Sequence, residues 1–354
     1  MSETVKVCVT GATGFLGSWV VKEALDAGFE VHGTTRSEAK TNFLQNLDGA
    51  AERLKMFSGC DLTKKGSFDA AIEGCKIVIH TASPFFMNHD DSGRAKLVEP
   101  ALEGTRTVLE ACAAKGVERV VLTSSTAAVY MAYGTKPLEE AFSEEDWSDA
   151  DVLEEKKNFY CLSKVLAERL AWELAAKDDC PFKLSVMNPC LIFGPMLPGQ
   201  THLNTSCNTI IGYFSAPKIK QQSIAVVDVR DVARAHVIAA RQDLDWAGWG
   251  QRNVLVGAVP MIAEVMQVLK ESDKVSDERK AKLPTEVDED IPPAGAGHPP
   301  PNRTKMNISQ SEKPVSDGGL GLKYYSLKDM VEATYQSLVD NDLDDIEKYT
   351  LDKE

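Results

Sequence analysis

The stretch VKVCVTGATGFLG, residues 5–17, is a largely apolar run followed by a turn that carries three glycines. A short run of this kind is typical of a strand buried in a parallel sheet. Gly11, Gly14 and Gly17 stand between this strand and a helical pattern that begins at Ser18. Glycine there lets the backbone turn tightly and approach a pyrophosphate at the start of a helix. The stretch therefore predicts a dinucleotide-binding turn, although its spacing is G-x-x-G-x-x-G rather than the commoner G-x-G-x-x-G.

Strand and helix patterns alternate from this turn to about residue 188. Further strands are expected at residues 30–34, 54–58, 76–80, 120–125 and 183–188. A long helix, bent at Pro100, is expected at residues 92–115. Such alternation builds βαβ units, whose parallel sheet is covered on both faces. The expected fold class is therefore α/β, a Rossmann-type doubly wound parallel sheet.

The residues after the second strand indicate which dinucleotide would bind. An acidic residue at this place binds the ribose 2′-hydroxyl of NAD. This chain instead has Arg36, followed by Lys40, and no carboxylate at the strand tip. A guanidinium presents a planar fork that suits a phosphate. We therefore expect NADP(H) as the cofactor, although Lys40 is equally typical of a solvated surface cation.

The chain divides into two expected parts. Residues 1–188 are expected to form the NADP-binding Rossmann domain, and residues 223–256 to return to it or to join the two parts. Residues 189–222 and 257–354 are expected to form a smaller, mostly C-terminal α/β lobe that binds substrate. Within these regions, strands are expected at 224–227 and 253–256, and helices at 231–241, 261–271 and 326–339. The Pro/Gly-rich segment 291–302 is expected to be a loop, and its role is undefined by sequence.

Tyr160 and Lys164 stand four apart at the start of a run of good helix formers, so their side chains share one helix face. A cation about 4 Å from a phenol is worth ~4 kcal/mol at an effective dielectric of about 20, or roughly three pKa units. Lys164 is therefore expected to lower the Tyr160 pKa from about 10 and make it a proton donor and acceptor. Tyr324 and Lys328 have the same spacing, but they follow a glycine-rich turn, and we interpret them as structural.

A pair of hydroxyls ends the strand pattern at residues 120–125. The carboxyl ends of strands line the ligand crevice in sheets of this kind. Ser125 is expected to donate to a substrate carbonyl beside Tyr160, and Ser124 is the alternative for that role. The tips of the neighbouring strands are expected to follow the cofactor, with Asp61 and Leu62 at the adenine.

Whole-chain features exclude several functional classes. A net charge of −14 over 354 residues argues against a general nucleic-acid or anionic-membrane surface. The eight cysteines form no C-x-x-C pair and no zinc spacing, which indicates reduced thiols and no metal site. The N-terminus leads straight into a strand without a signal-peptide pattern, and no apolar run is long enough to span a bilayer. A cytoplasmic protein is expected.

Several motifs together carry a family resemblance. They are TGATGFLG at 10–17, HTASP at 80–84, VEPA at 98–101, TSS at 123–125, NFYC at 158–161 with Lys164, NP at 188–189 and VDVRDVA at 227–233. With them the chain resembles the extended short-chain dehydrogenase/reductases, and within these the cinnamoyl-CoA reductase and dihydroflavonol reductase branch. The resemblance implies a catalytic triad of Ser125, Tyr160 and Lys164. It also places residues 189–192 beside the nicotinamide and makes the charges of residues 228–233 and His236 structural.

The sites expected from motifs and resemblance together are as follows. The cofactor contacts are Gly11, Thr13, Gly14, Phe15, Leu16, Arg36, Lys40, Asp61, Leu62, Thr81, Ala82, Ser83, Ser124, Tyr160, Lys164, Pro189, Leu191 and Ile192. The substrate contacts are Phe85, Tyr130 and Tyr213.

Three departures from the family pattern bear on the substrate. Phe159 replaces the usual Trp of cinnamoyl-CoA reductases, and Tyr130 stands where dihydroflavonol reductases carry an Asn or Asp. Residues 203–212 lack the His and Lys that serve the CoA phosphate in plant cinnamoyl-CoA reductases. An NADPH-dependent reductase of a small or medium aldehyde or ketone is therefore expected, as a monomer or homodimer. The alternatives are reduction of an acyl-CoA thioester and a non-catalytic NADP-binding redox sensor. A sugar-nucleotide epimerase is disfavoured, because such enzymes retain NAD.

Overall fold

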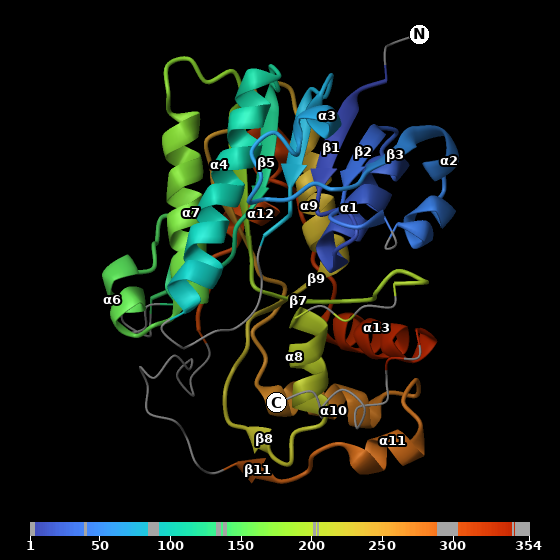
Figure 1. Ribbon diagram of the computed structural model, residues 1–354. Helices are drawn as coiled ribbons and strands as arrows, with labels where there is room; N and C mark the ends of the chain where they lie inside the picture. Colours follow the sequence, from blue (N-terminus) through green and yellow to red (C-terminus); the bar gives the residue numbers. More distant parts are fainter. Residues whose placement is uncertain are drawn as a thin grey trace.

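The computed structural model describes residues 4–38, 41–83, 92–131, 136, 140–200, 203, 205–288, 304–341 and 343 (Figure 1). Its main sheet has seven strands in the order β10-β6-β5-β4-β1-β2-β3, and every neighbouring pair is parallel. The strands are β1 (Lys6–Thr10), β2 (Glu30–Thr34), β3 (Leu54–Phe57), β4 (Ile77–His80), β5 (Arg119–Thr123), β6 (Lys183–Pro189) and β10 (Arg252–Leu255). The predicted α/β fold with a Rossmann-type parallel sheet is confirmed.

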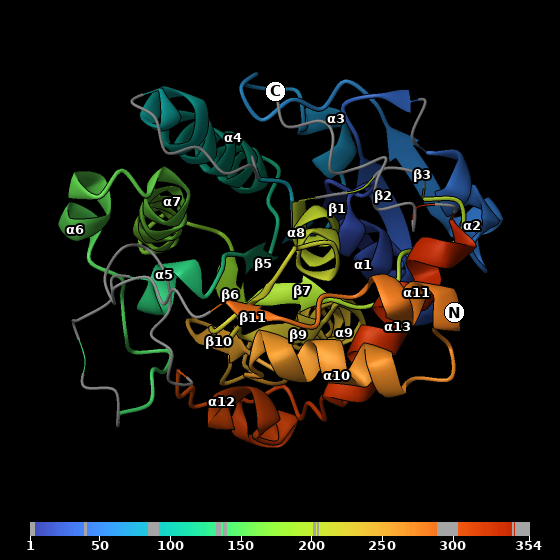
Figure 2. The same ribbon diagram turned by 90° about the horizontal axis from the view of Figure 1, so that it is seen from below.

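Alternate residues of β1 pack against opposite layers of helices, which explains why the strand is apolar on both faces. Val7 and Val9 belong to the core under α1 (Phe15–Asp26) and α9 (Val229–Ala240), whereas Cys8 belongs to the core on the other face. That second face is covered by α4 (Glu99–Ala114) and α7 (Phe159–Ala175), which pack against each other. The two helical layers lie on opposite sides of the sheet in Figure 2.

The helix expected at residues 92–115 is built from two pieces. A π-helical turn, η3 (Arg94–Val98), leads directly into α4. Pro100 lies in the first turn of α4, where the missing N–H would have no partner within the helix. The proline is therefore accommodated in the first turn of α4, directly after the change of helix type.

Shorter elements connect these layers. They are η2 (Asn42–Asn46), α2 (Ala50–Arg53), α3 (Asp69–Ile72), α5 (Ala127–Tyr130), α6 (Ala150–Glu155), α12 (Ser309–Glu312) and η4 (Val315–Asp317). Among the residues described, no helix is long and apolar enough to cross a membrane.

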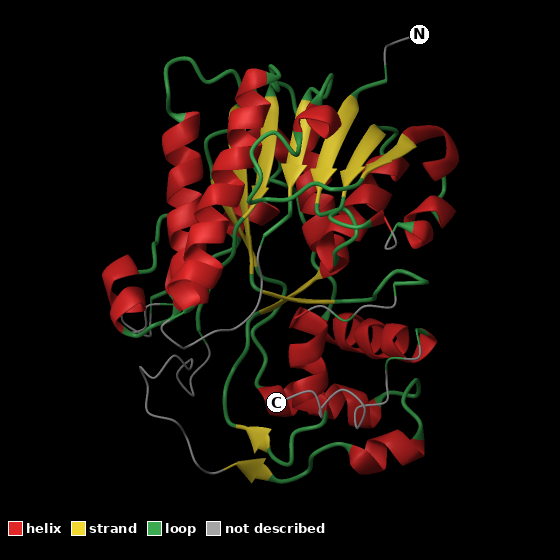
Figure 3. Ribbon diagram, viewed as in Figure 1, coloured by secondary structure: helices red, strands yellow, loops and turns green. Residues whose placement is uncertain are grey.

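A second group of elements lies beyond the carboxyl ends of the strands. All arrowheads of the main sheet point toward it in Figure 3. It comprises α8 (Thr205–Phe214), α10 (Ile262–Glu271), α11 (Asp277–Lys282), α13 (Leu327–Asp340) and the strand pair β8 (Ile219–Lys220) with β11 (Val287–Asp288). A further parallel pair, β7 (Leu191–Phe193) with β9 (Val226–Asp228), lies between this group and the sheet. Segment 291–302 lies outside the described residues.

Charged residues at the start of α9 join the helix to the C-terminal segment. Arg230 makes a bidentate pair with Asp228, and its guanidinium lies 3.7 Å from the ring centroid of Tyr325. The backbone N–H of Tyr325 donates to Asp231 at 2.9 Å. These contacts agree with the structural role that the sequence assigned to residues 228–233.

His236 is buried between α9 and the sheet and has protein partners at both ring nitrogens. Its Nδ1 donates to the Val232 carbonyl at 2.7 Å, and its Nε2 accepts from the Thr123 hydroxyl at 2.7 Å. Burial lowers its pKa to about 4. Between that value and the ordinary 6.5, the unfolded chain binds a proton that the folded chain does not, so stability falls as the pH falls.

Lowering the pH from 7.5 to 5 is therefore expected to destabilise the protein, by about 2 kcal/mol through this one imidazole. The comparison is urea unfolding of the wild type and of His236→Gln at both pH values. The variant lacks the titrating ring and is expected to lose less stability on acidification. An equal loss in both proteins would show that His236 does not carry the effect.

Candidate active site

The turn after β1 requires glycine for steric reasons. Gly11 has a φ of +68°, in the region that favours glycine. A Cβ atom on Gly17 would lie 2.1 Å from the Gly11 carbonyl oxygen, so no side chain fits there. Gly14 caps α1 without a side-chain hydrogen bond, and the first turn of α1 has no acidic residue. The positive end of the helix dipole is therefore left for an anion such as a pyrophosphate.

The same turn meets the end of β4. A Cβ atom on Gly11 would lie 3.1 Å from the Cα of Ala82. Thr81 Oγ1 donates to the Thr10 carbonyl at 2.6 Å, and the Ala82 N–H donates to Thr10 Oγ1 at 3.2 Å. The strand order reverses here, because β2 and β3 lie on one side of β1 and β4 lies on the other. Ligands of doubly wound sheets bind at such a switch point, beyond the carboxyl ends of the strands.

The tip of β2 places one cation beside this turn. Thr13 and Thr35 share a hydrogen bond at 3.2 Å between their hydroxyls, which holds the tip against the glycine turn. Arg36 follows directly and is exposed. It is also one of the charges that help to lower the pKa of Asp61 after β3, an effect due mainly to the Thr63 backbone N–H. Arg36 and Asp61 are thus brought to one edge, whereas Lys40 lies outside the described residues.

Helix α7 places Tyr160 and Lys164 on one face, next to Ser125 at the end of β5. The helix begins after Asn158, whose side chain accepts from the Cys161 N–H at 3.4 Å. Lys164 is buried, and its Nζ lies 5.8 Å from the ring centroid of Tyr160. The Ser125 hydroxyl is hydrogen-bonded to the half-buried Tyr160. The three residues expected to form a triad are therefore neighbours.

The electrostatics differ from the sequence-based expectation in one respect. Burial is the largest effect on the Tyr160 phenol and raises its pKa well above the usual range, while the hydrogen bond from Ser125 opposes the shift. Burial also lowers the pKa of Lys164 to about 8, against the pull of the Glu168 carboxylate. The prediction of a Tyr160 pKa below its usual value was wrong for this structure, because desolvation of the phenolate is the largest effect on the ring.

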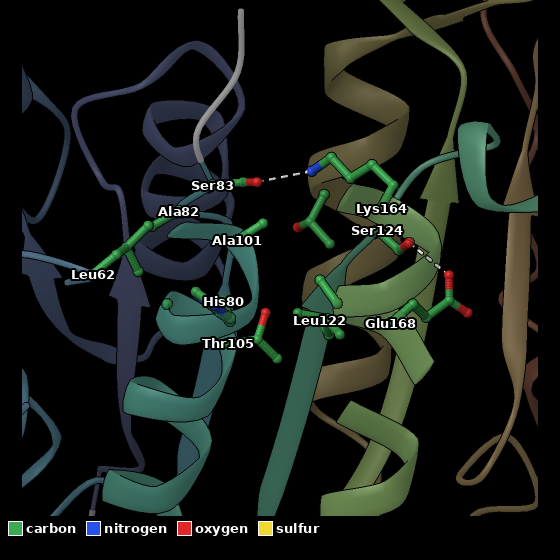
Figure 4. Close-up of a pocket in the computed structure, with 13 residues that line it drawn as sticks. Leu62, His80, Ala82, Ser83, Ala101, Thr105, Leu122, Ser124, Lys164 and Glu168 are labelled. Carbon is green, nitrogen blue, oxygen red and sulfur yellow. Dashed lines mark hydrogen bonds between the residues drawn. The ribbon is translucent and has the colours of Figure 1, made fainter. Parts of the chain in front are cut away.

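A pocket lies between the tips of β4 and β5 and the helices α4 and α7 (Figure 4). Lys164 reaches across it and donates to the Ser83 hydroxyl at 3.0 Å, so the ammonium links α7 to the tip of β4. Its lining is Leu62, His80, Ala82, Ser83, Ala101, Gly104, Thr105, Leu122, Thr123, Ser124, Lys164, Ala167 and Glu168. Five of the expected cofactor contacts, from three strand tips and one helix, therefore line one cavity.

The two serines that the sequence left as alternatives have different partners. Ser124 is buried and donates to Glu168 Oε2 at 2.6 Å. Ser125 accepts from the Ala127 N–H at 3.1 Å and lies beside Tyr160. Ser125 is therefore the serine beside Tyr160, whereas Ser124 is bonded to the interior of the protein.

Sequence reasoning missed the pair that Glu168 forms with Arg252. Glu168 is buried four residues after Lys164, and its Oε1 accepts from Arg252 Nε at 2.6 Å. The guanidinium also lies 3.9 Å from the ring centroid of Trp147. Extending the spacing of Tyr160 and Lys164 by one helical turn would have pointed to Glu168. No sequence signal reveals a partner 84 residues further on.

Two of the three expected substrate contacts come together on the side of the lobe. Tyr130 is the last residue of α5, and its hydroxyl is hydrogen-bonded to the Thr126 side chain. Tyr213 of α8 lies close enough to contribute to the raised pKa of Tyr130. The Tyr130 ring centroid lies 5.7 Å from that of Phe142. Phe142 in turn pairs with the C-terminal segment, accepting from the Asn307 N–H at 2.8 Å and donating to the Lys305 carbonyl at 2.9 Å. Phe85 lies outside the described residues.

The expected contacts after β6 lie beside the serine at the end of β5. The Pro189 carbonyl accepts from the Thr126 N–H at 2.9 Å, and Ser125 Oγ lies 3.4 Å from it. Leu191 and Ile192 are half-buried in β7. Tyr324 and Lys328, by contrast, do not share a helix face, because α13 begins at Leu327. The Tyr324 hydroxyl instead bonds to Ser311 at 2.7 Å, in agreement with the structural interpretation.

Comparisons with known proteins agree with this arrangement. The model of the NAD dependent epimerase/dehydratase family matches residues 7–247. The cinnamoyl-CoA reductase CAD2 of Medicago truncatula is 36% identical over 339 residues, which cover 94% of this chain and 95% of the relative. The NADPH-dependent methylglyoxal reductase GRE2 of Saccharomyces cerevisiae is 33% identical over 355 residues, covering 95% and 98%. The crystal structure of yeast methylglyoxal/isovaleraldehyde reductase Gre2 complexed with NADPH matches with a TM-score of 0.79 at 31% identity, covering 96% of this chain and 100% of that one.

The chain belongs to the NAD dependent epimerase/dehydratase family. It is an NAD(P)-dependent oxidoreductase of the extended short-chain dehydrogenase/reductase type, as the motifs predicted. Within the described residues, no group of His, Cys, Asp and Glu side chains could hold a metal ion.

Proposed function

We propose that the protein is an NADPH-dependent carbonyl reductase that acts on a small or medium aldehyde or ketone. The observation that carries the proposal is the convergence of Ser125, Tyr160 and Lys164, with Lys164 bonded to the β4 tip that meets the glycine turn. A merely NADP-binding sensor would need the turn but not the hydroxyl, phenol and ammonium next to it. The convergence therefore favours an enzyme.

The residues present suit NADP(H). The cradle between Gly11 and Gly17 would be filled by a Cβ atom, and the start of α1 is free of acidic side chains, as a pyrophosphate requires. Arg36, exposed at the tip of β2, would bind the 2′-phosphate. Lys164 and the tip of β4 would hold the nicotinamide ribose. When bound, the cofactor supplies the hydride.

Tyr160 is the proposed proton donor. A phenol whose pKa lies above its usual range is protonated at neutral pH, which suits donation to a carbonyl oxygen during reduction. Ser125 orients that oxygen, since its hydroxyl already contacts Tyr160. As the proton leaves, negative charge develops on the Tyr160 oxygen, and the nearby Lys164 ammonium stabilises it. Proton donation and charge stabilisation therefore use only side chains that already lie together in the structure.

Reduction of an acyl-CoA thioester is the second candidate. The similarity to a cinnamoyl-CoA reductase over 94% of the chain favours it. The similarity to an NADPH-dependent methylglyoxal reductase over 95% of the chain favours the aldehyde or ketone. CoA brings several negative charges, and the sequence offers Lys218, Lys220 and Arg252 to meet them. Arg252 is buried in an ion pair with Glu168 and is not accessible to a CoA phosphate. Only Lys218 and Lys220, both exposed, remain of these three cations.

Tyr160→Phe is expected to reduce turnover by roughly 10²- to 10⁴-fold, because it removes the positioned acid. Cofactor affinity and thermal stability are expected to change little, since only one hydroxyl is lost. The assay is NADPH consumption with a panel of aldehydes and ketones. Tyr324→Phe is the matched control and is expected to retain turnover, because its hydroxyl bonds to Ser311 instead. A Tyr160→Phe protein with near-normal turnover would refute the mechanism.

Arg36→Ala is expected to weaken NADPH binding by about 10- to 100-fold, the loss of one charge-assisted contact to a phosphate. NADH binding is expected to change little, because NADH has no 2′-phosphate. Fluorescence titration of both cofactors against both proteins measures this. Equal affinity of the wild type for NADH and NADPH would contradict the assignment.

The two substrate classes are separated by comparing kcat/KM for an aromatic aldehyde with that for the matching acyl-CoA ester, at one salt concentration. The aldehyde is expected to be preferred, because few cations are placed to meet the CoA phosphates. A preference for the ester that disappears in Lys218→Ala or Lys220→Ala would establish the second candidate instead.

A further inference from the structure

We propose that Glu168 is a positioning residue that fixes Ser125, which follows β5, relative to Tyr160 and Lys164 of α7. The inference rests on the proposed function and adds to it a buried carboxylate whose two oxygens accept hydrogen bonds from protein donors. Tyr160, Lys164 and Glu168 follow one another at four-residue intervals along one face of α7. The first two reach the reacting atoms, and the third reaches the strands below.

Glu168 binds the ends of two strands to the helix. Its Oε2 accepts from the hydroxyl of Ser124, the residue directly after β5, at 2.6 Å and from Asn188 Nδ2 of β6 at 2.8 Å. The same Asn188 amide also donates to the Ser125 carbonyl at 3.2 Å. The backbone of Ser125 is therefore connected to α7 through Asn188 and Glu168 (Figure 4 shows Ser124 and Glu168).

Arg252 of β10 fixes the carboxylate from its other side. Its Nε donates to Glu168 Oε1 at 2.6 Å, and its Nη1 donates to the Glu144 carbonyl at 2.9 Å. The Trp172 indole donates to the same Oε1 at 3.3 Å. The carboxylate thus has donors from β5, β6, β10 and its own helix, and it has one orientation.

Stability alone does not account for such a pair. Replacing a buried ion pair with packed apolar residues is often neutral or stabilising, because desolvation offsets the Coulomb attraction. What an apolar cluster cannot supply is directional contact. Ser125 and Tyr160 lie on different elements, and a displacement of about 1 Å between reacting groups costs roughly 100-fold in rate.

Glu168 also acts on the charge of Lys164. The groups that face this ammonium are Tyr160 and Glu168 of its own helix, Ser83 and the neutral His80 from β4, and, beyond Glu168, Arg252 from β10. Glu168 is the one that favours the charged amine. Removing its charge leaves a second cation uncompensated nearby, so the ammonium is lost at lower pH.

The central test is Glu168→Gln, which keeps the shape of the side chain and removes its charge. NADPH titration counts the folded sites, and kcat is expressed per site. We expect kcat to fall about 10- to 100-fold, the KM for NADPH to change less than about threefold, and the alkaline limb of the kcat–pH profile to move to lower pH. Glu173→Gln, on the exposed face of the same helix, is the control and is expected to match the wild type.

Asn188→Ala separates geometry from charge and remains informative if Glu168→Gln does not fold. It leaves the pair of Glu168 with Arg252 intact and cuts the connection to Ser125. We expect a lower kcat with an unmoved alkaline limb. Suppose that the wild type is active and Tyr160→Phe is inactive, but that either variant has a normal kcat per folded site. That result would overturn the positioning role of Glu168 and leave the proposed function standing. A wild type that consumes no NADPH with any carbonyl would overturn the proposed function itself.

Discussion

The close approach of backbone to backbone at the end of β1 is the constraint on which the site depends. A Cβ atom on Gly17 would collide with the Gly11 carbonyl, and one on Gly11 would be strained by the positive φ and packed tightly against Ala82. This contact brings the tips of β1 and β4 together and aims the start of α1 at the space between them. This contact also fixes the position of Ser83, to which the Lys164 ammonium donates a hydrogen bond.

Burial sets the chemistry of the groups around that space. Tyr160, Lys164 and Glu168 lie on one helix face and are progressively more buried in that order. In a weakly polar interior each charge depends on a specific partner, because water does not screen it. The polar side chains of the site are therefore coupled, so that a change at Glu168 alters the environment of Lys164 and Tyr160.

The fold could be predicted further than the site. The pattern of apolar residues predicted the strands of the sheet within one or two residues, because all of them except the edge strand β3 are largely buried on both faces. The pair Tyr160 and Lys164 was predictable from local helix geometry. The ion pair of Glu168 with Arg252 could not be predicted, since the two residues are 84 positions apart and meet only after the sheet forms. The Tyr160 pKa was misjudged for a related reason: desolvation depends on everything packed around the ring.

The attachment of Phe142 to the C-terminal segment has a consequence for how the protein can evolve. Phe142 is held beside Tyr130 by backbone hydrogen bonds to Lys305 and Asn307. Main-chain bonds are indifferent to side-chain identity, so point mutations can alter this aromatic wall while its anchorage persists. The side chains around Tyr130, an expected substrate contact, can thus change without rebuilding the sheet, which is how one fold can come to host many activities.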